Sequence, residues 1–373
     1  MLPYGRHDIH PADIDAVVDV LRGDWLTTGP AVERFEAALA SWTGGVPCVA
    51  VSSGTAALHT AYVAAGLGTG DEVVTSPMSF VATAATAAQL GATVVFADVD
   101  DLGNLDPAAV QAAVTSRTAV ITGVDYAGHP AEYDELVKVA EQAGAVLIDD
   151  AAHAIGSRYR DRPVGTLADL TTFSFFPTKT VTTAEGGAVA VADPDRLDRA
   201  RRFRNHGLVR EPARLRDPDQ GGWHQEVHGF GLNYRLPDVL CALGTSQLRR
   251  LAETRARRAW LVARYDTLLA GIPGLGLPSR RQYTEPCWHL YPVRVRDGRR
   301  REVYERMRAA GIGVQVHFLP VYWHPVFADL GYRRGLCPAA EAFYAEQLSL
   351  PLYPSLTDAE QDRVVDVVQS ILG

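Results

Sequence analysis

The chain has 373 residues, enough to bury a sizeable core and to form two domains or one large and one small lobe. Its hydrophobic content of 47% and charged content of 21% are those of an ordinary globular protein. The net charge of −8 argues against nucleic-acid binding, because no basic field would attract a phosphate backbone. Basic runs at 199–204 and 249–258 are interpreted as solvated helix faces or as a patch for an anionic small molecule.

Cysteines and apolar runs indicate the compartment. The four cysteines are scattered, without a C-x-x-C pair or zinc spacing, so we predict free thiols, a reducing environment and no metal site. The first residues contain no apolar signal core, and no apolar run reaches the ~20 residues that span a bilayer. We therefore expect a cytoplasmic protein that binds neither a membrane nor nucleic acid.

Short β-rich runs and helix-length segments alternate along the first half of the chain, after a helix over 11–21 and a loop over 25–30. The predicted strands cover 47–51, 72–75, 93–99, 119–124, 145–149, 171–176 and 187–192. Alanine-rich helical patterns lie between the earlier strands, at 56–65, 81–90, 107–114 and 133–143. Apolar strands separated by helices predict an α/β fold with a mostly parallel seven-stranded sheet, and ligands collect at the carboxyl ends of such strands.

The pattern changes after about residue 246. A long helix over 247–269 is followed by a Pro/Gly-rich segment at 271–278. A strand over 288–295, a helix over 301–310, a strand over 314–317 and a helix from 339 are predicted to follow. We therefore expect a small C-terminal α/β domain over 249–373, beside an N-terminal segment and large domain over 1–248.

The segment Ser52-Ser-Gly-Thr-Ala-Ala-Leu58 follows the first predicted strand and opens a helix. Free N–H groups at a helix start, with Gly54 permitting close approach, can bind an anion such as a phosphate. The segment is not a P-loop, because it lacks the G-x-x-x-x-G-K-[ST] pattern. An ordinary helix cap is the alternative interpretation.

Two acids end the strand predicted over 145–149, in the segment Asp149-Asp150-Ala-Ala-His153. Adjacent strand residues point to opposite faces, so the two carboxylates are not expected to share one role. One can face a ligand while the other faces backbone donors or solvent, and a loop acid pair that caps a helix is the alternative. A metal site is disfavoured, because no second His or Cys cluster accompanies His153.

An aromatic residue and a lysine follow two further strands. Phe80 comes after the strand at 72–75, and it could stack on a planar ring or pack in the core. Lys179 lies in a Thr-rich loop after the run at 171–176, where an amine can form a Schiff base if its pKa is lowered and a carbonyl is held nearby. A solvated loop lysine is the alternative. A phosphate cradle, a stacking aromatic, a carboxylate for a ring nitrogen and a Schiff-base lysine together meet the requirements of pyridoxal 5′-phosphate (PLP).

The chain resembles the DegT/DnrJ/EryC1/StrS sugar aminotransferases, PLP enzymes of fold type I, over essentially its whole length. The matching segments are Trp25-Leu-Thr-Thr-Gly-Pro, Ser53-Gly-Thr-Ala-Ala-Leu, Asp149-Asp-Ala-Ala-His, Phe173-Ser-Phe with Lys179 and Glu185-Gly-Gly, Arg204-Asn-His-Gly, Asn233-Tyr-Arg and Trp288-His-Leu-Tyr. Two others, Pro3-Tyr-Gly-Arg-His-Asp-Ile and Val124-Asp-Tyr-Ala-Gly-His-Pro, are most similar to the UDP-4-amino-4,6-dideoxy-N-acetyl-altrosamine transaminase branch. That branch aminates C4 of UDP-4-keto-6-deoxy-N-acetylhexosamines, as in pseudaminic acid synthesis.

The resemblance implies a role for each matching residue. Lys179 would bond to PLP and shuttle protons, and Asp150 would keep the pyridine nitrogen protonated. His153, where the family often has Gln, would reach the 3-oxygen of the ring, and Phe80 would stack on the ring. The phosphate would be held by Gly54, Thr55, Ala56 and Ser174, together with Asn233 from the other subunit of a homodimer with shared sites. Residues expected near the sugar or the amino donor are Thr27, Thr28, Arg235 and His317.

Three positions depart from the family pattern. Ala184 stands where many relatives have Gly, and Phe176 stands where some have His. Asp149 replaces the more usual Glu, which we expect to be tolerated behind the site.

The implied function is an aminotransferase that takes an amino group from L-glutamate, by family analogy, and passes it to a nucleotide-linked keto-sugar. A dTDP-keto-sugar or a keto-cyclitol of antibiotic synthesis is the alternative substrate. A relative that removes the sugar 3-hydroxyl is disfavoured, because that branch replaces the lysine with histidine. The alternative of another class is a PLP-binding regulatory protein without turnover, which loss of Lys179 or a fused DNA-binding module would favour; neither is seen.

Overall fold

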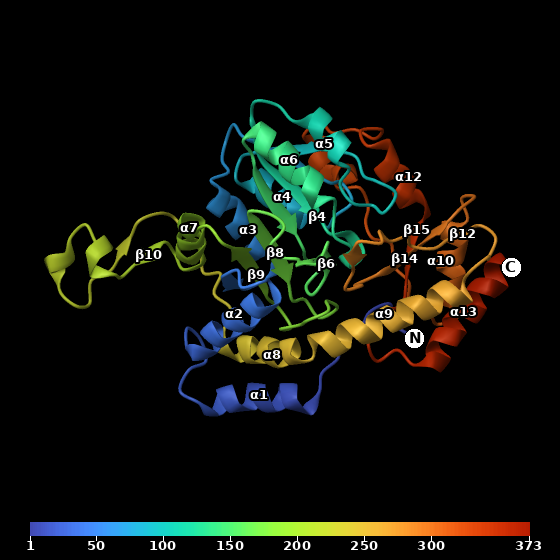
Figure 1. The fold of residues 1–373 in the computed structure, drawn as a ribbon, viewed down its shortest axis with the longest axis horizontal. Coiled ribbons are helices and arrows are strands. Elements are labelled where there is room, and N and C mark those ends of the chain that lie inside the picture. The colour runs from blue at the N-terminus through green and yellow to red at the C-terminus, as the bar shows by residue number, and fades with distance from the viewer.

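A seven-stranded sheet forms the centre of the computed structural model, which describes residues 1–373 (Figure 1). Its strand order is β1-β9-β8-β5-β4-β2-β3. The bounds are β1 Cys48–Val51, β2 Glu72–Thr75, β3 Thr93–Phe96, β4 Thr118–Val124, β5 Val146–Asp150, β8 Leu170–Ser174 and β9 Gly187–Val191. Only β9 runs antiparallel to its neighbours, so the prediction of a mostly parallel seven-stranded sheet is confirmed.

Helices cover both faces of this sheet, because its strands are apolar on both sides. Along β1, Val49 and Val51 belong to the core under α3 and α4, whereas Cys48 and Ala50 belong to the core under α2 and α6. The helices that cover the two faces are α2 Pro30–Trp42, α3 Gly54–Ala65, α4 Ala82–Gln89, α5 Pro107–Ala113, α6 Tyr133–Ala143 and α7 Pro194–Arg204. The loop predicted over 25–30 ends one residue earlier, since Pro30 opens α2, where its fixed φ and missing N–H are favourable.

Three helices lie along one side of the molecule, at the bottom of Figure 1. They are α1 Pro11–Arg22, α8 Asp238–Arg249 and α9 Leu251–Leu268. The single helix predicted over 247–269 is wrong: α8 and α9 are separate, and Arg250 at the break has φ −103° and ψ 3°. The Arg250 guanidinium donates to the buried Asp13 of α1 at 2.6 Å, which links all three helices at the break.

The C-terminal part contains a small antiparallel sheet in the order β12-β14-β15. Its elements are β12 Leu275–Gly276, β14 Tyr291–Val295, α10 Arg300–Ala309, α12 Pro338–Glu346, β15 Gln347–Leu350 and α13 Asp358–Leu372. The strand predicted over 314–317 is wrong, because only Gln315 pairs there, in a bridge to Ser349. The third strand of the sheet is β15. The predicted helix from residue 339 ends at Glu346 in the structure, and β15 follows it directly. Its polar residues Gln347 and Ser349 are buried, so the segment lacks the apolar signature of a core strand.

The domain boundary predicted at residue 248 stays a prediction. Segments from each side of residue 248 pack in the core of the other part. Phe327 and Phe343 pack in the core of the large sheet, as part of a segment that contains η4 Val321–Trp323 and α11 Pro325–Asp329. A third sheet joins β13 Thr284–Glu285 to β6 Arg158–Tyr159 and β7 Arg162–Pro163. Leu2, in turn, packs in the core of the C-terminal sheet.

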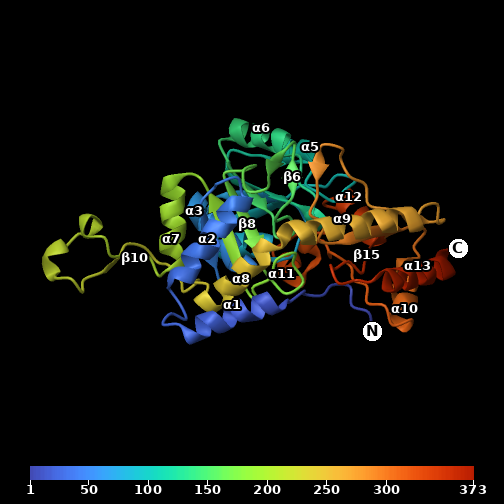
Figure 2. The same ribbon diagram turned by 60° about the horizontal axis from the view of Figure 1, so that its bottom comes forward.

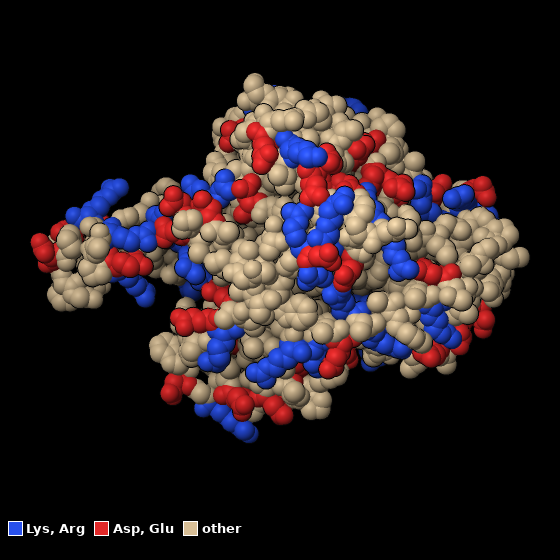
Figure 3. All heavy atoms as spheres, viewed as in Figure 1, with Lys and Arg blue, Asp and Glu red and all other residues tan.

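A long arm over 206–231 projects from the body, as Figures 1 and 2 show from two directions. Two short strands, β10 Leu208–Val209 and β11 Glu226–Val227, pair at its base. Trp223 is 84% exposed and Phe230 is fully exposed, although large aromatic side chains are usually covered. Acidic and basic residues are interspersed on the arm and on the rest of the face in Figure 3, so this face carries no field of one sign.

Candidate active site

The carboxyl ends of β4, β5 and β8 open onto a cavity of about 560 Å³. Eight of the predicted site residues line it: Gly54, Thr55, Phe80, Asp150, His153, Ser174, Lys179 and His317. They come from separate segments of the chain, and the parallel strands bring them together at one edge of the sheet.

The start of α3 forms one end of the cavity. The Ser53 hydroxyl accepts the N–H of Ala56 at 3.0 Å. The N–H groups of Gly54 and Thr55 have no helical acceptors, because these residues are the first two of the helix. A Cβ at Gly54 would lie 2.8 Å from the Ser174 Cβ, so only glycine lets the serine hydroxyl lie against the helix end. These donors fit a phosphate. Ala56 is buried and does not line the cavity, so a direct contact from it remains only a prediction.

Asp150 ends β5 and is 4% exposed. Its carboxylate accepts the Thr83 hydroxyl at 2.6 Å and the N–H of Ala152 at 3.2 Å. Burial raises the pKa of Asp150, while the Thr83 hydroxyl, the Ala152 N–H and the Lys179 charge act in the opposite direction. A buried carboxylate of this kind is stabilised by a cation, and a protonated ring nitrogen would supply one.

Lys179 lies in the turn after β8, where its N–H donates to Phe176 O at 2.9 Å. Burial lowers the pKa of its amine to about 8, although the nearby Asp150 carboxylate favours the charged form. The neutral fraction at pH 7 is therefore far larger than that of an ordinary lysine, although the charged form still predominates, and the neutral amine is the form that acts as a nucleophile and proton acceptor. The alternative of a solvated loop lysine does not agree with this placement.

Three imidazoles form one wall of the cavity: His289 and His317 are buried, and His153 is half-buried. The rings of His153 and His289 lie 4.4 Å apart, and Phe318 lies nearly parallel to His153 at 6.0 Å. Burial lowers the pKa of His153 and His289 well below the usual value, and that of His317 to about 3, so all three are neutral at pH 7. The His153 Nδ1 is buried without a partner and is available to a ligand atom.

Phe80 lies at the cavity with 61% of its surface exposed. Its ring meets Phe318 edge to face at 6.4 Å. The core-packing alternative for Phe80 therefore does not describe its position, and its free face can cover a planar ring.

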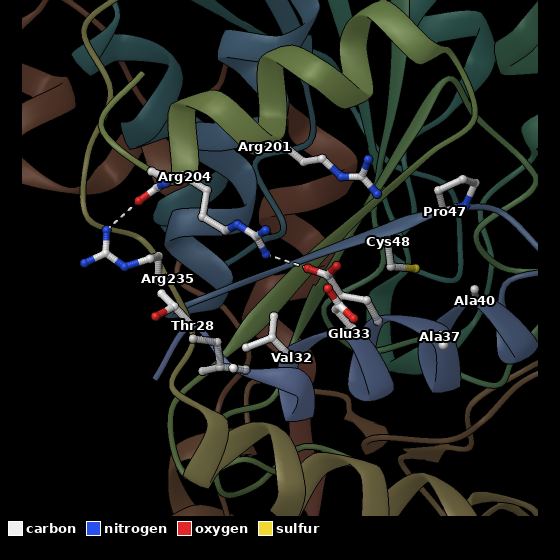
Figure 4. A pocket seen from close by; sticks show the side chains of 14 residues that line it. Thr28, Val32, Glu33, Ala37, Ala40, Pro47, Cys48, Arg201, Arg204 and Arg235 are labelled. Atoms are coloured by element: carbon white, nitrogen blue, oxygen red, sulfur yellow. Dashed lines mark hydrogen bonds and ion pairs between the residues drawn. The ribbon is translucent and has the colours of Figure 1, made fainter. Parts of the chain in front are cut away.

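The remaining predicted residues lie elsewhere. Thr28 and Arg235 line a different cavity of about 700 Å³, shown in Figure 4, with Arg201 and Arg204. There Arg235 donates to Asn205 at 2.6 Å, and Arg204 pairs with Glu36 at 2.5 Å. Two further predicted residues, Thr27 and Asn233, are exposed and line neither cavity. A single chain therefore does not bring these four residues to Lys179.

Several cavity residues carried no predicted role. Thr83 lies in the first turn of α4, and its N–H donates to Phe80 O at 3.3 Å, so the turn that leads into the helix places both residues at the cavity. His289 lies in the segment Trp288-His-Leu-Tyr, which was recognised as a match without a role for the imidazole. Tyr4 lies in the matching segment Pro3-Tyr-Gly-Arg-His-Asp-Ile, which likewise was given no role for its side chain. Phe318 gave no local signal, because only packing between distant parts of the chain brings it to the site.

Comparison with known proteins agrees with this geometry. The model of the DegT/DnrJ/EryC1/StrS aminotransferase family matches residues 7–369. The chain belongs to this family. A Bacillus subtilis member, the spore coat polysaccharide biosynthesis protein SpsC, is 38% identical over 100% of this chain and 97% of its own. The UDP-4-amino-4,6-dideoxy-N-acetyl-beta-L-altrosamine transaminase of Campylobacter jejuni is 35% identical over 100% of this chain and 98% of its own.

A solved family structure has the same fold. Spr1654 of Streptococcus pneumoniae in its PMP form superposes with a TM-score of 0.94 at 31% identity, covering 100% of this chain and 99% of that one. Its PLP form superposes with a TM-score of 0.93. The protein is thus a fold-type I sugar aminotransferase that uses PLP, and its cavity fits that cofactor: α3 offers phosphate donors, Asp150 a carboxylate and Lys179 an amine. No helix in the structure combines the length and apolarity needed to cross a membrane.

Proposed function

We propose that this aminotransferase moves an amino group from L-glutamate to C4 of a UDP-4-keto-6-deoxy-N-acetylhexosamine. The observation that carries the amino-transfer chemistry is the convergence of Lys179, Asp150 and the start of α3 on one cavity. The 35% identity to a C. jejuni enzyme named for a UDP-linked amino sugar supports the sugar class. Four free, buried cysteines support a cytoplasmic location, where thiols stay reduced.

The roles of the side chains follow from their chemistry. PLP supplies an electron sink that stabilises negative charge at the carbon bearing the amine. The neutral Lys179 amine takes and returns the proton at that carbon, since its lowered pKa suits both directions. Asp150 would keep the ring nitrogen of the bound cofactor protonated, and the neutral His153, whose Nδ1 has no partner within the chain, would reach the ring 3-oxygen. Phe80 shields one face of the ring from water.

A homodimer with shared sites belongs to this proposal. Asn233, Thr28 and Arg235 lie away from Lys179 in one chain, although all three match family segments. A second copy that presents this surface to the cavity would supply them to the phosphate and the substrate. The exposed aromatic residues of the arm support an interface on that side.

An absorbance titration tests the function. Protein loaded with PLP and converted by L-glutamate to the amine form should recover the band of the lysine-linked cofactor when the keto-sugar is added. Recovery only with a dTDP-keto-sugar or a keto-cyclitol would contradict the proposed substrate. The variant Lys179→Ala should fold but lack both the band and turnover, and full activity in it would exclude the proposed role.

A further inference from the structure

A buried acid pair lies behind the active site, on the face of β5 opposite Asp150. Asp149 and Asp125, which follows β4, are both 0% exposed, and the Tyr133 hydroxyl of α6 lies between them. The Tyr133 Oη is 2.5 Å from the Asp149 Oδ1 and 3.0 Å from the Asp125 Oδ1. The neighbouring Thr171 hydroxyl on β8 is buried beside Asp149 with no partner within hydrogen-bond distance, and it lowers the pKa of that carboxyl.

The two contacts of the Tyr133 hydroxyl need one more proton than the phenol carries. A phenol has a single O–H hydrogen, so it can donate to only one of the two carboxyl oxygens. The other contact requires that a carboxyl donate to the Tyr133 Oη. If both acids were ionised, two charges would be buried with one phenol hydrogen and one backbone N–H between them, which is very unfavourable.

The contacts also decide which acid holds the proton. Asp125 accepts the N–H of Ala131 at 2.9 Å as well as the phenol, and both contacts favour its ionised form. The Asp149 carboxyl accepts no backbone N–H: the Tyr133 hydroxyl lies on its Oδ1, its Oδ2 has no partner within hydrogen-bond distance, and the nearby Thr171 hydroxyl is the one other donor that favours its ionised form. Burial raises the pKa of both acids, that of Asp125 to about 7 and that of Asp149 well above its usual value, and the neighbouring charges of Asp125 and Asp150 raise that of Asp149 further.

We propose that Asp149 is a protonated carboxylic acid that donates to Tyr133, which in turn donates to an ionised Asp125. A concerted shift of two hydrogens, from Asp149 to the Tyr133 Oη and from that oxygen to the Asp125 Oδ1, moves the proton without changing the total charge of −1. Asp149 is thereby a positioning residue: it keeps a second charge away from Asp150, and its network joins α6 to the ends of β4 and β5. Its relevance to catalysis rests on the proposed role of Asp150.

Infrared spectroscopy of the cofactor-free protein tests the proton directly. With ¹³C-labelled aspartate at pH 7, the wild type should show the C=O band of a buried protonated carboxylic acid. The band should disappear in Asp149→Asn and remain in Asp150→Asn, the matched neighbour. A band that survives in Asp149→Asn, or its absence from the wild type, would overturn the proposal. Because PLP is absent, the result is independent of the proposed enzyme function.

Tyr133→Phe and urea unfolding provide independent readouts. Removing the phenol takes away the acceptor of Asp149, so the band should shift, and an unchanged band would overturn the assignment. The unfolding constant of the wild type relative to Asp149→Asn should rise with pH, by up to about tenfold per unit above the unfolded pKa of about 3.9. A ratio that stays flat or falls with pH would mean that Asp149 is ionised in the folded protein.

Discussion

Ala184 is a residue whose backbone conformation conflicts with its side chain. It precedes Glu185 in the loop between Lys179 and β9, and its φ is +66°, in the left-handed region. The resemblance to the family leads us to expect glycine here, the residue that adopts this region without cost. Its exposed methyl group makes little packing contribution to offset the strain.

We expect Ala184→Gly to stabilise the fold. The left-handed conformation costs an L-residue about 1–2 kcal/mol, part of which the greater freedom of unfolded glycine offsets, so the net gain should be about 0.5–1 kcal/mol. Urea unfolding of the cofactor-free protein measures it. The exposed Ala112 in α5 is the matched control, and Ala112→Gly should lose about 1 kcal/mol. If both substitutions lowered the free energy of unfolding, Ala184 would not be strained.

At the scale of elements, one buried acid fastens α1 to the junction of α8 and α9. Asp13 is 0% exposed and accepts the Gln247 side-chain amide at 2.7 Å and the Arg250 guanidinium at 2.6 Å. Burial raises its pKa, but the His10 N–H, the Ser246 hydroxyl and the Arg250 charge together lower it below the usual value. The helix break at Arg250 is therefore the point at which three helices are joined.

We expect Asp13→Asn to cost about 2 kcal/mol at pH 7, because it removes a charge-assisted hydrogen bond to the half-buried Arg250, which keeps only the longer ion pair with Asp8 at 3.6 Å. The folded pKa of Asp13 is lowered, so its contribution is present above the unfolded pKa of about 3.9 and is lost as the pH falls toward the folded pKa. The difference in the free energy of unfolding between the wild type and Asp13→Asn should therefore become smaller as the pH falls. Urea unfolding between pH 3 and 7 measures this, with the exposed Asp15→Asn as control. A difference that is constant or widens in acid would contradict the ion pair.

At the scale of the whole molecule, the arm and the cavity of Figure 4 lie on the same side of the fold, where no other part of the chain covers them. The free Phe230 lies three residues before Asn233, so the exposed aromatic residue and the predicted phosphate ligand are close in the chain. A second copy seated there would cover the aromatic side chains and complete the site in one step.

Complementation tests this arrangement. Lys179→Ala and Asn233→Asp should each be nearly inactive, the first for lack of the amine and the second because its charge repels the phosphate. Mixed dimers, co-expressed with two tags and purified through both, should recover about half of the wild-type activity, because one of their two sites is then free of both changes. If both residues served the same site within one chain, the mixed dimers would stay inactive.

The residues that could be predicted from the sequence are those with a local signature. Each strand of the central sheet is an apolar run between helix-length segments, and Asp150 and Lys179 stand at the ends of such runs. β15 escaped prediction, because Gln347 and Ser349 face His317 across the small sheet and give the strand a polar pattern. Thr28 and Arg235 matched family segments, but a local match does not tell which copy of the chain a residue serves.

The packing of the first residues bears on how the enzyme should be produced. Leu2 forms backbone bonds with Gly311 and Gly313, and Tyr4 lines the active-site cavity beside His317. A purification tag fused ahead of Met1 would join the chain only three residues before Tyr4, close to the catalytic pocket, and would compete with the sugar substrate. Gly373, by contrast, is exposed at the end of α13, and no residue of that helix lines the active-site cavity. Tags are best fused there, and N-terminal ones cleaved before kinetic work.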